Sequence, residues 1–194
     1  MAMALCPEKQ WKAQEEIDAL LGGDHLPTVA DRDKLPYVSA IIKETMRWHP
    51  TLPLSLARQT DKDDVYEGYF IPRGTMVMPN VWFIAYDADA RYDPEEFIPE
   101  RFLDEDVPTP DPASWVFGFG RRVCPGRFLA ENSVFVIVAN ILAAFDISLP
   151  TEGNLSPKFT LDLVSYPEPY ECQITPRSDA MARLVESRAI QCNI

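Results

Sequence analysis

The hydrophobic positions of the first fifty residues predict two helices. One helix covers residues 7–21 and ends at Gly22–Gly23, because glycine is the usual residue just beyond a helix C-terminus. Its apolar face consists of Trp11, Ile17, Leu20 and Leu21. A second helix covers residues 35–50, since Pro36 suits a first helical turn and Pro50 marks the end. The chain therefore opens with a helical region.

A third helix is predicted to begin at Arg127. It contains the longest apolar run of the chain, residues 134–145, which is apolar nearly all round and therefore typical of a buried core helix. This run is shorter than a membrane span and is interrupted by Asn140.

The remaining apolar runs are short and are separated by glycine and proline. Residues 53–82 alternate in this way and predict small strands, whereas residues 87–113 are rich in Asp, Glu and Pro and predict an ordered loop. The pieces 159–167 and 170–176 predict one or two terminal hairpins, and the tail from Ser178 is predicted to be frayed. The pattern as a whole predicts a mainly α fold with small β-sheets.

Composition and charge narrow the class of protein. The chain has 194 residues, 46% of them hydrophobic and 25% charged, which is enough for one domain with its own core. A net charge of −12 argues against a nucleic-acid partner. Arg121, Arg122 and Arg127 nevertheless form a local positive cluster, which favours either an acidic protein partner or neutralisation of a bound anion.

The cysteines and histidines do not form a recognisable metal or disulfide pattern. Four cysteines, Cys6, Cys124, Cys172 and Cys192, show no CxxC spacing, which disfavours a zinc site and a disulfide framework. The two histidines, His25 and His49, are isolated, and His49 at a helix end is interpreted as a packing or capping residue.

The loop FGFGRRVCPG, residues 117–126, is the strongest chemical feature. Three glycines permit close backbone approach to a flat ligand, and two adjacent arginines place positive charge near Cys124. Because the predicted helix begins directly after the loop, its N-terminal dipole also favours an anion there. The loop thus favours a thiolate, which is a metal ligand or a nucleophile.

Three other interpretations of this loop are open from the residues alone. Cys124 could be a buried free thiol in a glycine-rich turn. A dinucleotide-binding loop fits poorly, because position 123 is Val where GxGxxG requires Gly. A cysteine hydrolase would need a positioned base, and His25 and His49 are the only histidines.

Glu44 and Arg47 stand three residues apart on the second predicted helix. They lie on the side of this helix roughly opposite its apolar residues, so the helix pattern favours an exposed ion pair. The alternative is a buried pair completed by a third charge, for which the sequence PERF, residues 99–102, supplies Arg101.

Taken together, these motifs resemble the cytochrome P450 family. Phe117, Gly120, Arg122, Cys124 and Gly126 have the spacing of its haem-binding signature, and ExxR and PERF precede them in the family order. The resemblance runs from about Met3 to Arg177, so residues 1–177 are expected to be the C-terminal part of such a domain and 178–194 a tail.

The resemblance implies roles for individual residues. Cys124 would be the axial ligand of the iron of haem b, and Arg122 and Arg58 would bind the two propionates. Phe117, Gly118 and Gly126 would lie around the ligand loop. Glu44, Arg47 and Arg101 would form a buried triad behind the haem.

The resemblance also implies an activity and partners. Family members are monooxygenases that place one atom of dioxygen in an apolar organic substrate, with electrons from a reductase. A reductase would dock near Arg121 and Arg127, and residues 52–56 and 163–165 would line the substrate pocket. The amino-acid sequence resembles that of fungal members of the family. The resemblance implies that the full-length protein lies in the endoplasmic reticulum membrane.

The resemblance covers less than half of the family's domain. The opposite wall of the haem pocket and the membrane anchor of the microsomal members are expected to lie outside this sequence. No signal peptide is visible in it. The alternative function is therefore a truncated, non-catalytic fragment that binds haem weakly or not at all.

Overall fold

The computed structural model describes residues 1–23, 25–150 and 156–192. Its α-helices are α1 (Ala2–Leu5), α2 (Pro7–Leu21), α3 (Pro36–Trp48), α4 (Val81–Tyr86), α5 (Arg127–Ala144) and α6 (Asp179–Cys192). Short 3-10 helices are η1 (Val29–Lys34), η2 (Pro99–Phe102), η3 (Pro112–Ser114) and η4 (Gly120–Arg122). The strands are β1 (Arg58–Gln59), β2 (Asp64–Tyr66), β3 (Tyr69–Ile71), β4 (Met76–Val77), β5 (Phe145–Ser148) and β6 (Gln173–Pro176). They form three antiparallel pairs, β1–β4, β2–β3 and β5–β6, so the fold is mainly helical with small sheets, as predicted.

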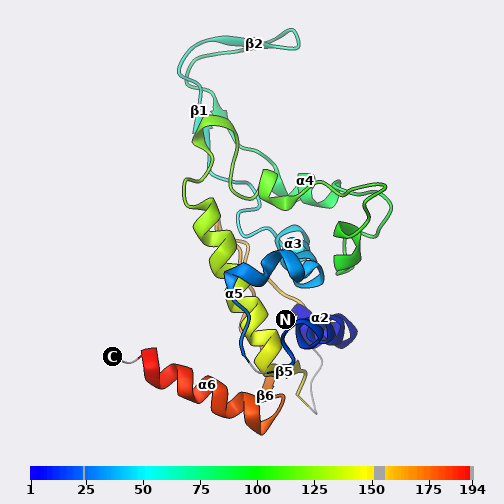
Figure 1. Ribbon diagram of the computed structural model, residues 1–194. Coiled ribbons are helices and arrows are strands. Elements are labelled where there is room, and N and C mark those ends of the chain that lie inside the picture. The colour runs from blue at the N-terminus through cyan, green and yellow to red at the C-terminus, as the bar shows by residue number, and fades with distance from the viewer. Residues whose placement is uncertain (24, 151–155, 193–194) are drawn as a thin grey trace.

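The core lies where α2, α3 and α5 meet (Figure 1). Ile17 of α2, Val38 of α3 and Phe135 of α5 are almost completely buried there. Burying such side chains contributes about 1.5–3 kcal/mol each. The three predicted helices thus form the scaffold on which every other segment is placed.

Helix α2 has the predicted bounds, and Ile17 and Leu21 of its predicted apolar face are buried, but Trp11 is not. Gly22 ends the helix in the left-handed conformation, with φ of 61°. Trp11, which the pattern assigned to the apolar face, is 59% exposed, whereas Gln10 is buried. Gln10 faces inward because its amide pairs with the backbone of Ile147 in β5, at 3.1 and 2.9 Å. Long-range backbone pairing therefore overrides hydrophobicity here.

Helix α5 is buried on one side only, so the prediction of an all-round core helix is wrong. Phe135, Ala139 and Leu142 face the core, while Ile137 and Ile141 of the same predicted run are 57% and 38% exposed. Phe128 and Leu129, in the first turn of the helix, are 68% and 74% exposed. Within the described residues, α5 alone has the length and apolar composition that a membrane span would need. Since its buried side is part of the core, α5 acts as a supporting helix of this fold.

The strand-rich segment forms two small hairpin-like pairs that lead away from the helices. Strands β2 and β3 are joined through Glu67 and Gly68, whose φ values are 49° and 86°. Two successive positive φ angles suit a tight hairpin turn. Figure 1 shows this hairpin extending beyond β1. The end of the segment forms α4, which the sequence pattern did not predict; the Asn80 side chain caps it by accepting from the Phe83 N–H at 3.0 Å.

The C-terminal segments pair differently from the prediction. Residues 159–167 close on themselves through a single bridge between Phe159 and Pro167. Strand β6 pairs with β5, which continues α5, and does not pair with residues 159–167. The tail forms helix α6 where a frayed end was predicted, with Met181 buried and its N–H donated to the Ser178 hydroxyl at 3.2 Å.

Candidate haem-thiolate site

The loop before α5 presents Cys124 at the surface. Its thiol is free and exposed, which contradicts the interpretation of a buried cysteine. The Cys124 N–H donates to the Phe117 carbonyl at 2.8 Å and closes the loop into a ring. Gly118 and Gly120 have φ values of 83° and 58°, a conformation that is costly for residues with a Cβ. The backbone therefore fixes the loop and leaves the sulfur available.

Two of the predicted haem-binding arginines lie together. Strand β1 carries Arg58 to the loop, where its Nη2 lies 3.4 Å from the Arg122 carbonyl oxygen. Both side chains are exposed. The sequence could not show this proximity, because the residues stand 64 positions apart. The structure thus places two guanidinium-bearing residues beside the exposed thiol loop.

The chemistry of these side chains fits a haem. A soft thiolate donor suits iron, and guanidinium groups form paired hydrogen bonds with carboxylates such as propionates. Phe119 and Val123, on the same loop, are 43% and 39% exposed and offer apolar contact to a flat macrocycle.

Behind the loop lies a buried ionic triad. Glu44, Arg47 and Arg101 are at most 1% exposed. Arg47 binds Glu44 through two bonds, Nε–Oε2 at 2.7 Å and Nη2–Oε1 at 2.8 Å, and Arg101 Nε lies 3.1 Å from Glu44 Oε2. The exposed ion pair that the helix pattern favoured is therefore wrong.

The triad is buried because the segment before η2 covers that face of α3. Arg47 donates to the carbonyls of Pro94 and Glu96 at 3.0 and 3.2 Å. Glu44 accepts from the Ile98 N–H at 2.8 Å. These bonds compensate the loss of hydration, as buried charges require, and they tie an irregular segment to the helix.

Glu100 of the PERF sequence is a second ionic centre that sequence reasoning missed. It accepts from Lys9 at 3.0 Å, Lys12 at 2.7 Å and the Tyr37 hydroxyl at 3.0 Å. Burial acts to raise the pKa of Glu100, but these hydrogen bonds and one from its own backbone outweigh burial and hold the pKa at about 2. The pKa of the Tyr37 hydroxyl is raised, mainly by burial and secondly by its hydrogen bond to Glu100. The centre joins α2, α3 and η2.

The two stretches expected to line the substrate pocket meet around one cavity of about 400 Å³. Pro53 and Leu54 line it from the first stretch, and Leu163 and Ser165 from the second. The wall is largely apolar, which suits an apolar ligand. His49 also lines this cavity.

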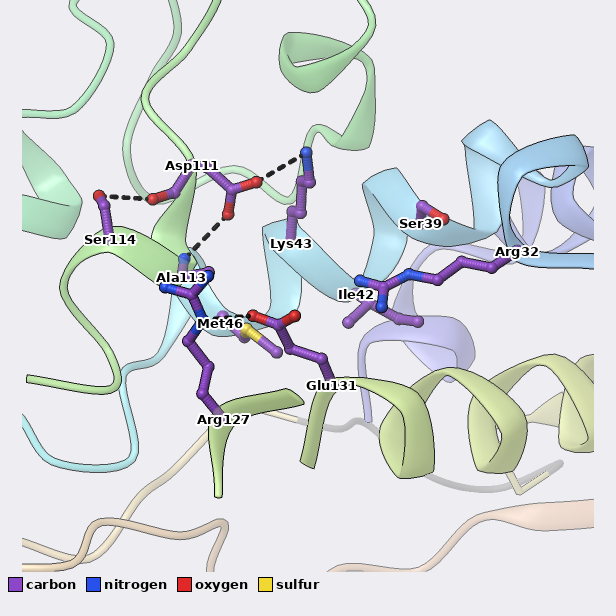
Figure 2. Close-up of a pocket in the computed structure, with 10 residues that line it drawn as sticks. All are labelled: Arg32, Ser39, Ile42, Lys43, Met46, Asp111, Ala113, Ser114, Arg127 and Glu131. Carbon is purple, nitrogen blue, oxygen red and sulfur yellow. Dashed lines mark hydrogen bonds and ion pairs between the residues drawn. The ribbon is translucent and has the colours of Figure 1, made fainter. Parts of the chain in front are cut away.

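The proposed docking patch is only partly free. Arg121 is exposed, but Arg127 faces a cavity of about 350 Å³ between α3, η3 and α5, where its Nε lies 3.4 Å from Glu131 Oε1 (Figure 2). Figure 2 also shows Lys43 on this cavity, bound to Asp111 at 2.9 Å. The positive charge of Lys43 and Arg127 therefore extends the patch beyond the cysteine loop. It is partly neutralised by Asp111 and Glu131.

The histidines give no support to a cysteine hydrolase. His25 Nδ1 lies 3.4 Å from the Leu26 carbonyl, and His49 Nε2 lies 2.7 Å from Ser165 Oγ. Neither hydrogen bond involves Cys124. In the part of the chain that the structure describes, no cluster of three or more His, Cys, Asp or Glu residues could hold a metal ion.

Comparisons with known proteins agree with these features. A sequence model of the cytochrome P450 family matches residues 1–174. The cytochrome P450 monooxygenase claR of Ampulloclitocybe clavipes is 45% identical over 192 residues, which are 95% of this chain and 36% of that protein. Cytochrome P450 monooxygenase 208 of Postia placenta is 48% identical over 184 residues, 92% of this chain and 36% of the relative.

A solved structure shows the same fold. A zebra fish cytochrome P450, determined with abiraterone, superposes with a TM-score of 0.78 at 34% identity, covering 91% of this chain and 42% of its own. The chain thus spans about a third of the length of the curated relatives it matches. Its fold is part of the cytochrome P450 fold, and haem b is the cofactor of the family. The chain therefore belongs to the cytochrome P450 family.

Proposed function

We propose that this chain forms the thiolate-bearing part of a haem-dependent monooxygenase. The observation that carries the proposal is the exposed Cys124 thiol, held by a backbone-closed loop beside Arg58 and Arg122. An exposed thiol with adjacent guanidinium groups suits a metal-bound macrocycle with acidic side arms.

Each loop residue has a distinct task in this proposal. Cys124 provides the sulfur that binds haem iron, and Arg122 and Arg58 hold the two propionates. Gly118 sets the loop conformation, and Gly126 brings the backbone beside the sulfur, where an added Cβ would lie 3.8 Å from Sγ, an ordinary contact distance. Phe117 lines a cavity of about 200 Å³ together with Met46 and Leu52. The bound haem would supply the dioxygen chemistry, in which one oxygen atom enters the substrate and the other leaves as water.

The triad acts as the support of this site. Glu44, Arg47 and Arg101 fix α3 to the segment before η2, and α3 in turn leads directly into the stretch 52–56. That stretch and residues 163–165 would contact a small apolar organic substrate. Arg121, with Arg127 and Lys43, would receive an acidic reductase, because complementary charge steers such encounters. The endoplasmic reticulum membrane is the proposed location of the full-length protein.

The alternative function is a non-catalytic fragment. Exposed apolar side chains on α5, including Phe128 and Leu129, favour it, because they offer a large uncovered surface beside the thiol loop. A macrocycle covered on one face keeps only part of its apolar burial and is bound more weakly.

The absorption spectrum of the reduced, carbon-monoxide-bound protein tests the proposal. The purified chain is reconstituted with haem, and thiolate ligation is expected to shift the Soret band strongly to the red. Cys124→Ala is expected to abolish the shift, whereas Cys172→Ala, a matched change at another free thiol, is expected to keep it.

Two results would contradict the proposal. If the unaltered chain shows no red-shifted band, it does not form the site and the fragment alternative holds. If Cys124→Ala keeps the band, another group is the ligand.

A further inference from the structure

The turn formed by residues 159–167 carries three apolar side chains into solvent. Leu161, Leu163 and Val164 are 103%, 62% and 47% exposed. The turn is closed at its base by Thr160 N–H to the Tyr166 carbonyl at 2.9 Å. A short turn with such a tip has no apolar packing of its own at that end. Its position therefore depends on its attachment elsewhere.

That attachment is made by Trp48, the last residue of α3, and by His49 and Thr51 just after it. The Ser165 N–H donates to the Thr51 carbonyl at 2.8 Å, and the His49 ring stacks on Phe159 with centroids 3.4 Å apart and planes 12° apart. Trp48 meets the same Phe159 ring edge-on. The ring contacts hold the first arm of the turn at Phe159, and the Thr51 contact holds the second arm at Ser165.

A hydrogen bond from His49 completes the attachment, and its direction is fixed. Ser165 Oγ lies 2.7 Å from the Thr160 carbonyl oxygen and 2.7 Å from His49 Nε2. A carbonyl only accepts, so the single hydroxyl proton goes to Thr160. His49 Nε2 must then carry a proton and donate it to Ser165. Ser165 is 4% exposed, so this bond is shielded from water.

We propose that His49 is a positioning residue that fixes the 159–167 turn against the stretch 52–56 and thereby sets the shape of the apolar substrate wall. Both segments line the cavity of about 400 Å³, and His49 lies three residues before the first of them. Ser55 in that stretch has a positive φ of 52°, so the opposing wall is also held in a constrained conformation. The wall role rests on the proposed function, whereas the attachment itself does not.

Hydrogen exchange on the full 194-residue chain, without haem, tests the attachment. Loss of one buried hydrogen bond is expected to speed amide exchange in residues 159–168 about tenfold. His49→Phe keeps an aromatic ring but removes the donor, and it is expected to show this increase. Ser165→Ala removes the acceptor together with the Ser165–Thr160 bond, and it is expected to show at least this increase. His49→Gln restores an N–H donor and is expected to recover most of the protection. Ser133→Ala, an exposed serine on α5, is the matched control.

Ligand binding to the haem-loaded protein tests the wall. The Kd of an imidazole that carries a phenyl ring is expected to rise about fivefold in Ser165→Ala and His49→Phe, while the Kd of imidazole itself stays unchanged. Imidazole needs only the iron, whereas the phenyl ring needs the wall.

The outcomes separate the two proposals. Unchanged exchange of residues 159–168 in both variants would overturn the attachment. The wall role would be overturned if exchange became faster but the variants changed the Kd of imidazole and of the phenyl-bearing imidazole by the same factor. Failure of the unaltered chain to bind haem would overturn the proposed function and the wall role with it, while the exchange data would still decide the attachment.

Discussion

The buried triad and the cysteine loop differ in how their polar groups are satisfied. In the triad, Glu44 is bound by two arginines and a backbone N–H, and the arginines also bind carbonyls of the segment before η2. In the loop, the backbone is closed by one hydrogen bond, but the Cys124 thiol is free and the side chains around it are exposed. The first region is satisfied almost entirely within the chain; among its buried polar atoms Arg101 Nε makes an ion-pair contact with Glu44 but no hydrogen bond. The second leaves its polar groups exposed to solvent, where a ligand can bind them.

This difference separates stability from binding. Buried paired charges destabilise a protein strongly when one partner is removed. Exposed side chains on a backbone-fixed loop contribute little to folding. Substitutions in the triad should therefore change the free energy of unfolding, whereas substitutions of the exposed side chains in the loop should mainly change haem binding.

The largest effect is expected for Glu44→Ala. It leaves the Arg47 and Arg101 guanidinium groups buried without their carboxylate. We expect the free energy of unfolding to fall by about 3–5 kcal/mol, with loss of stable haem retention. Urea denaturation followed by circular dichroism measures the first effect, and haem content measures the second. Glu105→Ala, at an exposed glutamate, is the control. A variant at Glu44 with normal stability and haem content would show that the triad does not support the site.

A smaller effect is expected for Gly118→Ala, within the loop. Gly118 has a φ of 83°, where a Cβ costs about 1–2 kcal/mol. Gly126→Ala is the matched control, because Gly126 lies outside the left-handed region and its added Cβ would make only an ordinary contact with the sulfur. Thermal denaturation of the haem-free variants compares them. Equal melting temperatures would mean that the backbone conformation at Gly118 does not hold the loop.

Sequence reasoning succeeded where local chemistry decides the structure. The bounds of α2 and α3 follow from Pro7 and Pro36 at their starts and from Gly22 and Pro50 after their ends. The cysteine loop was recognisable because glycines, arginines and a thiol stand within ten residues.

It failed where distant segments decide the environment. No periodicity on α3 shows that residues 93–98 will cover Glu44 and Arg47, so the pattern favoured an exposed pair. The link between His49 and Ser165 joins residues 116 positions apart. The sequence also does not predict the exposed face of α5, because an apolar helix does not indicate which of its sides are covered by neighbouring segments.

Acid is expected to weaken the chain through Glu100. Its pKa of about 2 lies below the usual 4.5, so its ionised form is stabilised by folding. This contribution is fully present above pH 4.5 and is lost as the pH falls toward 2. Because the carboxylate is partly exposed, we expect about 1 kcal/mol after solvent screening. Glu100→Gln should flatten the fall of unfolding free energy across that interval, as urea titrations at successive pH values would show. An unchanged slope would mean that the lysine contacts do not hold the carboxylate ionised.

The smallest effect on stability is expected for Cys124→Ala. Its thiol is exposed and free, so the haem-free variant should match the unaltered chain within about 0.5 kcal/mol in urea. Haem-loaded protein should behave differently, because a ligand that binds only the folded state adds stability in proportion to its affinity. The unaltered chain should therefore gain stability with added haem, and the variant should gain much less. A loss of more than about 1 kcal/mol without haem would place Cys124 among the residues that hold the fold, and the contrast with the triad would disappear. If haem stabilises the variant as much as the unaltered chain, Cys124 is not the haem ligand. The difference in folding stability between triad and loop would still stand.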